Sequence, residues 1–175
     1  MNRYTAISLS AIIIIIVVIA YSASSIFAAN QIQFKSVDEE KFRFFDLVNK
    51  GKIDLCNPGP TFANFNEITL ELIHDGKSIG KFSSQKIGLP PFSASQVQGK
   101  FTSERFEETQ YLALHYDGMF SGSTPVRIDP TQLQVVSKIT SNFLGVIPIT
   151  ISQDYSGLEF WEIMNNNEEY SCNSN

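Results

Sequence analysis

Few residues in this chain of 175 residues have the chemistry of a catalytic or metal-binding site. Two cysteines, Cys56 and Cys172, and two histidines, His74 and His115, are widely separated along the sequence. A zinc site needs three or four His, Cys or carboxylate ligands, usually at short and regular spacings. Isolated histidines do not provide such a set. We therefore expect no metal site and no cofactor.

Hydroxyl and carboxylate groups also lack a catalytic pattern. Ser121 lies in FSGST, which is not the G-x-S-x-G turn of serine hydrolases. The nearby Gly118 and Gly122 do not form a phosphate-binding loop. The acidic run at 38–40 lies at the start of an expected helix, where negative charge interacts favourably with the helix dipole. The sequence predicts that the protein is not an enzyme and has no catalytic residues.

The meaning of the two cysteines depends on the compartment. In an oxidising compartment an even number of cysteines predicts a disulfide, and within one chain only Cys56 and Cys172 can pair. Chain-entropy estimates give about 4.7 kcal/mol for closing a loop of about 100 residues. Such a bond would fasten the polar tail to the strand before Pro58. Two free thiols and an intermolecular bridge are the alternatives.

The first 29 residues form a segment that is expected to insert into a lipid bilayer. No charged residue occurs from Ala6 to Ala29, and residues 11–20 are AIIIIIVVIA. About 20 apolar residues suffice to cross the hydrocarbon core, so residues 6–28 are predicted to contact lipid. We favour an uncleaved single-pass anchor. The alternative is a signal peptide cut at 22–24 or 28–29, which would release a secreted protein.

The flanking charges predict the orientation of this segment. Arg3 and the α-amino group precede it, whereas the acidic run at 38–40 follows it. The positive-inside tendency then leaves the N-terminus in the cytoplasm and the rest of the chain outside the cytoplasm. That remainder divides into a domain at 30–166 and a polar tail at 167–175. The formal net charge of −5 argues against a nucleic-acid partner and against a polybasic lipid-binding surface.

Alternation of apolar and polar residues predicts a series of short strands. Asp75-Gly76, between two alternating runs, is the strongest hairpin signal in the chain, and Asp117-Gly118 is interpreted as a second turn. PVRIDP, between two prolines, suits an edge strand. The strands are expected in KIDLCNP, NEITLELI, SIGKF, SQVQGKFT, TQYLALHYDG, PVRIDP, LQVVSKIT and GVIPITIS. Strands at this spacing predict an antiparallel β-sandwich or barrel and not βαβ units.

Two short helices are expected around the strands. Ser36 and Glu39 have the spacing of a capping box, which with Gly51 as the C-terminal cap predicts a helix over 37–49. Ser156 and Glu159 repeat that spacing. They predict a C-terminal helix whose packed face carries Leu158, Trp161 and Met164.

The strand and turn pattern resembles a known family. The stretch KIDLCNPGP…FNEITLELIHDGKSIGKF…IGLPPFSASQVQGKF is similar to the water-stress and hypersensitive-response (WHy) domain of the second subgroup of late embryogenesis abundant (LEA) proteins, of the archaeal, membrane-anchored type. The matching turn residues are Asn57, Pro58, Asp75, Gly76 and Gly80. The resemblance implies a fibronectin-III-like or immunoglobulin-like β-sandwich, a link to stress or desiccation tolerance, and no catalytic residues. The leading helix and Cys56 depart from the family pattern.

These observations favour a non-catalytic, membrane-anchored β-sandwich protein with a binding or structural role at the cell surface. Its partner would be a cell-surface protein, a glycan or lipid headgroups, and the sequence does not indicate an oligomeric state. One alternative is a stress-protective or desiccation-protective LEA-type protein. A second is a pilin-like filament subunit, in which the apolar helix packs in a filament core.

Overall fold

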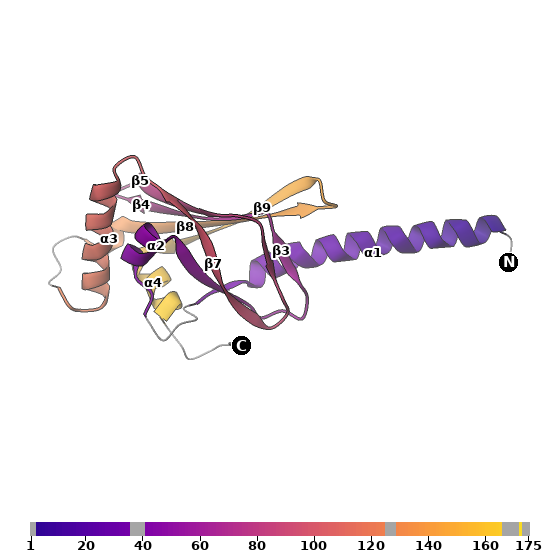
Figure 1. Ribbon diagram of the computed structural model, residues 1–175, viewed down its shortest axis with the longest axis horizontal. Coiled ribbons are helices and arrows are strands. Elements are labelled where there is room, and N and C mark those ends of the chain that lie inside the picture. Colours follow the sequence, from indigo (N-terminus) through magenta and orange to yellow (C-terminus); the bar gives the residue numbers. More distant parts are fainter. Residues whose placement is uncertain (1–2, 36–40, 125–128, 166–171, 173–175) are drawn as a thin grey trace.

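The computed structural model describes residues 3–35, 41–124, 129–165 and 172, and it shows a long helix followed by a mainly β domain (Figure 1). The elements in chain order are α1 (Arg3–Gln31), β1 (Gln33–Phe34), α2 (Phe44–Lys50), β2 (Lys52–Asn57), β3 (Ala63–Phe65), β4 (Glu67–His74), β5 (Lys77–Ser84), β6 (Ile87–Leu89), β7 (Ser93–Thr102), α3 (Phe106–Phe120), η1 (Pro130–Gln132), β8 (Leu133–Phe143), β9 (Ile147–Ser156) and α4 (Gly157–Asn165).

Seven strands form one curled antiparallel sheet in the order β1-β2-β7-β5-β4-β8-β9, and β3 pairs with β6 in a separate two-stranded sheet. Strand β7 makes the curl possible, because residues 93–98 pair with β2 whereas residues 99–102 pair with β5. Gly99 stands at this change of partner, where a Cβ atom would lie 2.5 Å from the Ser83 carbonyl oxygen. The sheet thus turns back over itself, and the predicted antiparallel β fold is confirmed.

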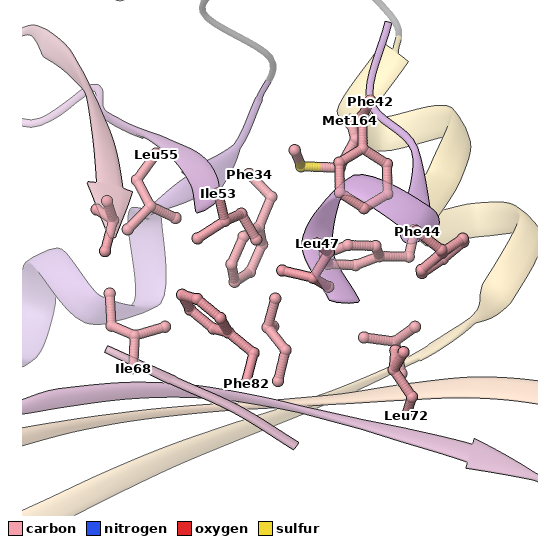
Figure 2. Packing of buried hydrophobic residues seen from close by; sticks show 14 of the residues in the cluster. Phe34, Phe42, Phe44, Leu47, Ile53, Leu55, Ile68, Leu72, Phe82 and Met164 are labelled. Carbon is pink, nitrogen blue, oxygen red and sulfur yellow. The ribbon is translucent and has the colours of Figure 1, made fainter. Parts of the chain in front are cut away.

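The hydrophobic core fills the space between the two halves of the curled sheet. Figure 2 shows Ile53 and Leu55 of β2 on one side and Ile68 and Phe82 of β4 and β5 on the other. These four side chains are at most 2% exposed. A cluster of aromatic rings closes the core beside the helices; it comes from β1, α2, α4 and the segment before α2 (Phe34, Phe44, Phe160 and Phe42).

Most of the predicted strands are present at the expected positions. The runs KIDLCN, NEITLELI, SQVQGKFT, LQVVSKIT and GVIPITIS correspond to β2, β4, β7, β8 and β9. The predicted hairpin joins β4 to β5 through a two-residue turn, in which Asp75 (φ 50°) and Gly76 (φ 71°) both adopt the left-handed conformation. A turn of this type requires positive φ at both positions, which Asp-Gly provides at little cost.

The predicted strand and turn in TQYLALHYDG are wrong, because residues 106–120 form the helix α3. Thr109, Leu112, Ala113 and Tyr116 are buried at i, i+3, i+4 and i+7, which is one face of a helix. Asp117-Gly118 continues this helix and is not a turn. The aromatic and alternating residues suggested a strand, but the helical spacing of the buried side chains determines the structure.

The leading helix is shorter than predicted. Residues 41–43 are not helical, and α2 begins at Phe44 behind Arg43, whose backbone is extended at φ −135° and ψ 136°. The expected capping box at Ser36 lies outside the described residues. Gly51 ends the helix with φ 59° and ψ 42°, as predicted. Most of the expected edge strand PVRIDP also lies outside the described residues.

The capping box of the C-terminal helix is confirmed. The Glu159 N–H donates to Ser156 Oγ over 3.1 Å, and the Ser156 N–H donates to Glu159 Oε2 over 3.3 Å. The predicted packed face is partly wrong, since Leu158 is 39% exposed whereas Phe160 is fully buried. Met164 is buried as expected. The ring of Phe160 enters the aromatic cluster, which explains the difference.

The sheet has two ends, which we call near and far according to their distance from the exposed part of α1. At the far end, the turn 75–76 lies beside α3 and η1, and His74 pairs with Leu133 at the start of β8. At the near end, the turn 144–146 joins β8 to β9 and lies alongside α1 (Figure 1). The 11 residues of β8 separate the two ends by about 33 Å.

Candidate functional site: the near end of the domain and its disulfide

The second half of α1 is built into the near end of the domain. Helix α1 packs against β3, β8 and β9, and Ser22, Ser25, Ala28 and Ala29 are at most 6% exposed. These small residues recur at helical spacing, so they let the helix backbone approach the sheet closely. The helix contains no proline or glycine from Arg3 to Gln31 and therefore has no residue that would kink it.

The first part of α1 extends beyond the domain (Figure 1). Large apolar side chains from Ile7 to Ile19 are 43–67% exposed, and Tyr4 and Tyr21 flank them at 79% and 59%. The Tyr21 hydroxyl accepts a hydrogen bond from Asn64 Nδ2 over 2.8 Å, which ties the helix to β3. Within the described residues, α1 is the helix long and apolar enough to cross a bilayer, with a mean hydropathy of 2.6.

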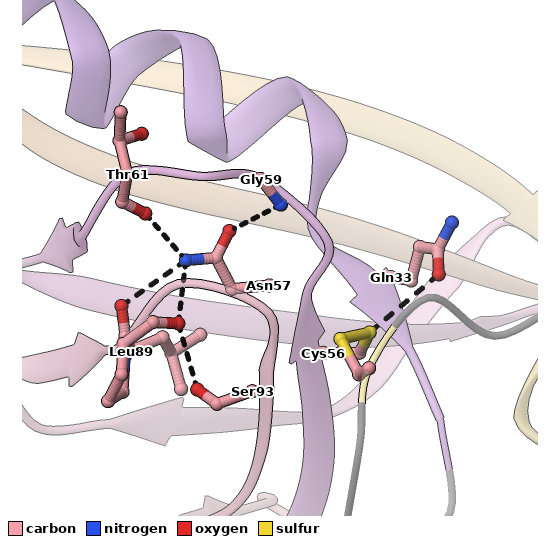
Figure 3. Close-up of a disulfide and its surroundings, with 9 residues drawn as sticks. Gln33, Cys56, Asn57, Gly59, Thr61, Leu89 and Ser93 are labelled. Atoms are coloured by element: carbon pink, nitrogen blue, oxygen red, sulfur yellow. Dashed lines mark hydrogen bonds between the residues drawn. A yellow bond between two sulfur atoms is a disulfide. The ribbon is translucent and has the colours of Figure 1, made fainter.

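A disulfide joins Cys56 to Cys172, as predicted, with Cα atoms 5.9 Å apart (Figure 3). Cys56 is fully buried on β2, between Gln33 of β1 and Ala94 of β7. The Cys56 sulfur lies 3.8 Å from Gln33 Oε1. Since Gln33 follows closely after α1, the disulfide holds Cys172 close to the C-terminal end of that helix. A disulfide of this kind is typical of an oxidising compartment outside the cytoplasm.

Asn57 is the hydrogen-bonding centre of the near-end loops (Figure 3). Its Nδ2 lies within hydrogen-bonding distance of the carbonyl oxygens of Thr61 (2.8 Å), Pro90 (2.9 Å) and Leu89 (3.3 Å). Its Oδ1 accepts from the Gly59 N–H over 3.1 Å. The fully buried amide thus joins two loops that are distant in sequence, which gives this motif residue a structural role.

The other motif residues lie apart from one another. Pro58 begins the loop after Asn57 at the near end, whereas Asp75 and Gly76 form the far-end turn. Gly80 lies on β5 beneath Phe101, whose ring occupies the space that a Cβ atom would need. The structure therefore does not bring the predicted residues together into one site. Each of them supports a turn or a close contact locally.

A groove lined by several cationic side chains lies between α2, β2 and β7. Its volume is about 370 Å³, and Lys41, Arg43, Lys50 and Lys52 line it. Asp46 and Asp54 also line the groove. Arg43 Nε and Lys50 Nζ contact Asp46 at 2.7 and 3.1 Å, so part of the positive charge is already neutralised. Although partial burial opposes ionisation, the hydrogen bonds from Arg43 and Lys50 lower the pKa of Asp46.

Asp117 is a buried carboxylate that sequence reasoning assigned to a turn. Its Oδ1 and Oδ2 each accept a backbone N–H, from Phe44 and Phe45, over 2.8 Å. This carboxylate therefore caps the start of α2 from α3. Burial raises the pKa of Asp117 to about 7, although the two backbone N–H donors favour the ionised form. The helical spacing of its neighbours was the signal that could have placed it.

The histidines are part of ordinary packing. His74 Nδ1 and the Tyr116 hydroxyl share a hydrogen bond of 2.8 Å. Burial, together with the charge of Asp129, raises the pKa of Tyr116 to about 12 and keeps its hydroxyl protonated. His115 stacks on Tyr111 with ring centres 6.2 Å apart. Among the residues that the structure describes, no three His, Cys, Asp or Glu side chains are grouped to hold a metal ion.

Comparisons with known proteins add little to this description. No protein-family model matches the chain, and a search of curated proteins finds no match. Among solved structures, a protein from Archaeoglobus fulgidus is similar over 71% of this chain and 90% of its own length, with 7% identity and a TM-score of 0.28. A similarity of this size supports no conclusion about fold or function.

Proposed function

We propose that this protein is anchored in a membrane by α1 and holds its β domain outside the cytoplasm, where the domain has a binding or structural role. One observation supports this most strongly. A single unbroken helix carries an exposed apolar segment at one end and is built into a disulfide-closed domain at the other. We infer no catalytic step, and a surface protein or a glycan is the proposed class of partner.

The test uses the absence of free thiols in the described chain. In the variant Lys77→Cys, the unpaired cysteine lies at the exposed first position of β5, next to the far-end turn. A membrane-impermeant maleimide should label this variant on intact cells, and the wild-type chain should remain unlabelled. Both chains should stay with the membranes after alkaline carbonate washing.

Two outcomes would contradict the proposal in different ways. Labelling of Lys77→Cys only after lysis would place the domain in the cytoplasm. Release of a chain without its apolar segment would identify a cleaved signal peptide and a secreted protein.

The same helix is also the observation behind the pilin-like alternative. Helix α1 projects from the domain and is seated in it as one rod, a shape suited to helix packing in a filament core. Shearing of cells should release the full-length chain in a filament fraction if this alternative holds. The stress-protective LEA-type function stays a prediction from the sequence resemblance.

A further inference from the structure

The tip of the β8–β9 hairpin is an apolar surface with no charged residue. Between Lys138 and Asp154 the chain contains no Asp, Glu, Lys or Arg. Leu144, Val146 and Ile147 at the tip are 40%, 76% and 51% exposed. Large apolar side chains grouped at an exposed turn indicate a contact with an apolar surface outside the domain.

The backbone of this tip is held in an unfavourable conformation for a leucine. Leu144 has φ 52° and Gly145 has φ 75°, so both lie in the left-handed region. Glycine tolerates this region, whereas a leucine there is costly. The turn conformation disfavours a leucine at position 144, and exposure to water disfavours its apolar side chain. Both facts suggest that the side chain makes a contact outside the domain.

The tip is fixed against α1 at a defined level. The Leu144 N–H donates to Ser22 Oγ over 3.2 Å, and the Ser22 hydroxyl donates in turn to the Val18 carbonyl over 2.9 Å. Ser22 directly follows Tyr21. The tip therefore lies beside the position where the helix emerges from the domain, as Figure 1 also shows.

The two exposed tyrosines of α1 give a measure of membrane depth. Tyr4 and Tyr21 are separated by about 26 Å at 1.5 Å per residue, close to the thickness of a hydrocarbon core. Tyrosines concentrate at both interfaces of membrane-spanning helices. With Tyr21 at one interface, the adjacent hairpin tip reaches the same interface.

The other near-end loops have the same character. No charged residue occurs between Asp54 and Glu67, or between Lys86 and Lys100. These segments form the loops joined by Asn57, and they expose Phe62 (53%) and Phe92 (51%). Three segments distant in sequence thus make the near end uncharged, apart from residues at its margin.

We propose that the β8–β9 tip inserts into the interfacial layer of the same bilayer that holds α1, as a second and shallow attachment of the domain. This inference rests on the proposed anchoring by α1. Apolar side chains of Leu144, Val146 and Ile147 would enter the boundary between headgroups and acyl chains, as interfacial segments do. Two attachments fix both the tilt of the domain and its rotation about the helix axis.

The experiment compares three variants of the full chain, each with one added, unpaired cysteine: Val146→Cys at the tip, Ile14→Cys in the exposed part of α1, and Lys77→Cys at the far end. Each carries a nitrobenzoxadiazole fluorophore and is reconstituted into vesicles of phosphatidylcholine and phosphatidylglycerol. Nitroxides on the upper acyl chain quench a fluorophore in lipid, and iodide quenches one in water. Peptide mapping confirms that the Cys56–Cys172 bond is intact in each variant.

We expect lipid-borne nitroxide to quench the label at Val146→Cys and at Ile14→Cys but not at Lys77→Cys. Iodide quenching at Val146→Cys should be about threefold or more weaker than at Lys77→Cys in the same vesicles, because an interfacial segment is shielded from water and its ions. Quenching at Ile14→Cys together with full iodide access at Val146→Cys would overturn the tip insertion and leave the anchor standing. Absence of lipid quenching at Ile14→Cys would overturn both proposals.

A third result would overturn the insertion and identify another contact. A tip label shielded from iodide and from lipid nitroxide, while Ile14→Cys is quenched, would show that a second copy of the chain covers the tip. Dilution of the protein in the vesicles should then restore iodide access.

Discussion

The hairpin turns at the two ends of the sheet share a backbone conformation but differ in the residues that adopt it. Asp75-Gly76 at the far end and Leu144-Gly145 at the near end each place two successive residues at positive φ. The far-end pair consists of residues that tolerate this conformation and solvent. The near-end pair includes a leucine, which tolerates neither well.

The contrast between the two turns indicates which surroundings suit each end of the domain. Local turn chemistry and solvent exposure agree at the far end, so that turn needs no further explanation. At the near end, a leucine suits neither the turn conformation nor exposure to solvent, and the turn lies next to a helix that is itself apolar and exposed. Compromises of this kind concentrate at contact sites.

Removal of the disulfide should have the largest effect. In the double variant Cys56→Ala/Cys172→Ala, the free energy of unfolding should fall by about 4 kcal/mol, because the unfolded chain regains the freedom of a long loop. Denaturant unfolding of the wild type with and without a reductant provides the matched comparison. Hydrogen exchange should increase at β1 and β2 before it increases at α3. Equal stability with and without the bond would contradict this prediction.

The buried Asp117 should give the far end a pH dependence. Its pKa is about 7 in the folded chain and 3.8 in the unfolded chain, so the folded form binds more protons between about pH 4 and 7. The free energy of unfolding should therefore fall as pH rises through this range, by on the order of 3 kcal/mol. The variant Asp117→Asn should lack this contribution. Unfolding curves of both chains at pH 4 to 8 measure the difference, and parallel profiles would refute the assignment.

Loss of the Asn57 amide should loosen the near-end loops. Asn57→Ala leaves buried carbonyl groups of two loops without their donor, so we expect the free energy of unfolding to fall by about 2 kcal/mol. Asn64→Ala is the matched control, because it removes a single exposed hydrogen bond to Tyr21. Its effect should be several times smaller. Similar losses in the two variants would mean that the buried network adds no special stability.

Exchange of residues between the two turns should produce small effects of opposite sign. Leu144→Asn should raise the free energy of unfolding in detergent by about 1 kcal/mol, since Asn tolerates positive φ better than Leu. Asp75→Leu should lower it by a similar amount at the far end. Denaturant titration of both variants measures the pair. If both changes destabilise the protein, Leu144 makes a contact within the domain that outweighs its strain.

The strands of this domain were predictable from sequence because their side chains alternate and a good turn separates β4 from β5. The disulfide was predictable for a simpler reason, since two cysteines allow one pairing. Helix α3 was missed although Thr109, Leu112 and Tyr116 have helical spacing. Asp117-Gly118 suggested a turn there, but in the structure the Asp117 side chain is drawn to the start of α2, 73 residues earlier in the chain.

The near end was harder to predict because it is assembled from distant segments. The absence of charge between Lys138 and Asp154 can be seen in the sequence, but its position beside Tyr21 depends on the register of β8 and β9. Likewise, Asn57 was recognised as a turn residue. Its contacts with Leu89 and Pro90 follow only from the pairing of β2 with β7. Local signals gave the elements, and long-range pairing created the site.

The position of the disulfide also determines how the molecule would carry mechanical load. A pull between the membrane and Cys172 passes along α1, through β1 and α2 to Cys56, and then directly across the covalent bond. The backbone from Asn57 onward, including β4, β5, β7, β8 and β9, lies outside that covalent path. Force enters these strands only through their noncovalent contacts with α1 and β2. The bond thus acts as a mechanical bypass for the backbone of most of the sheet.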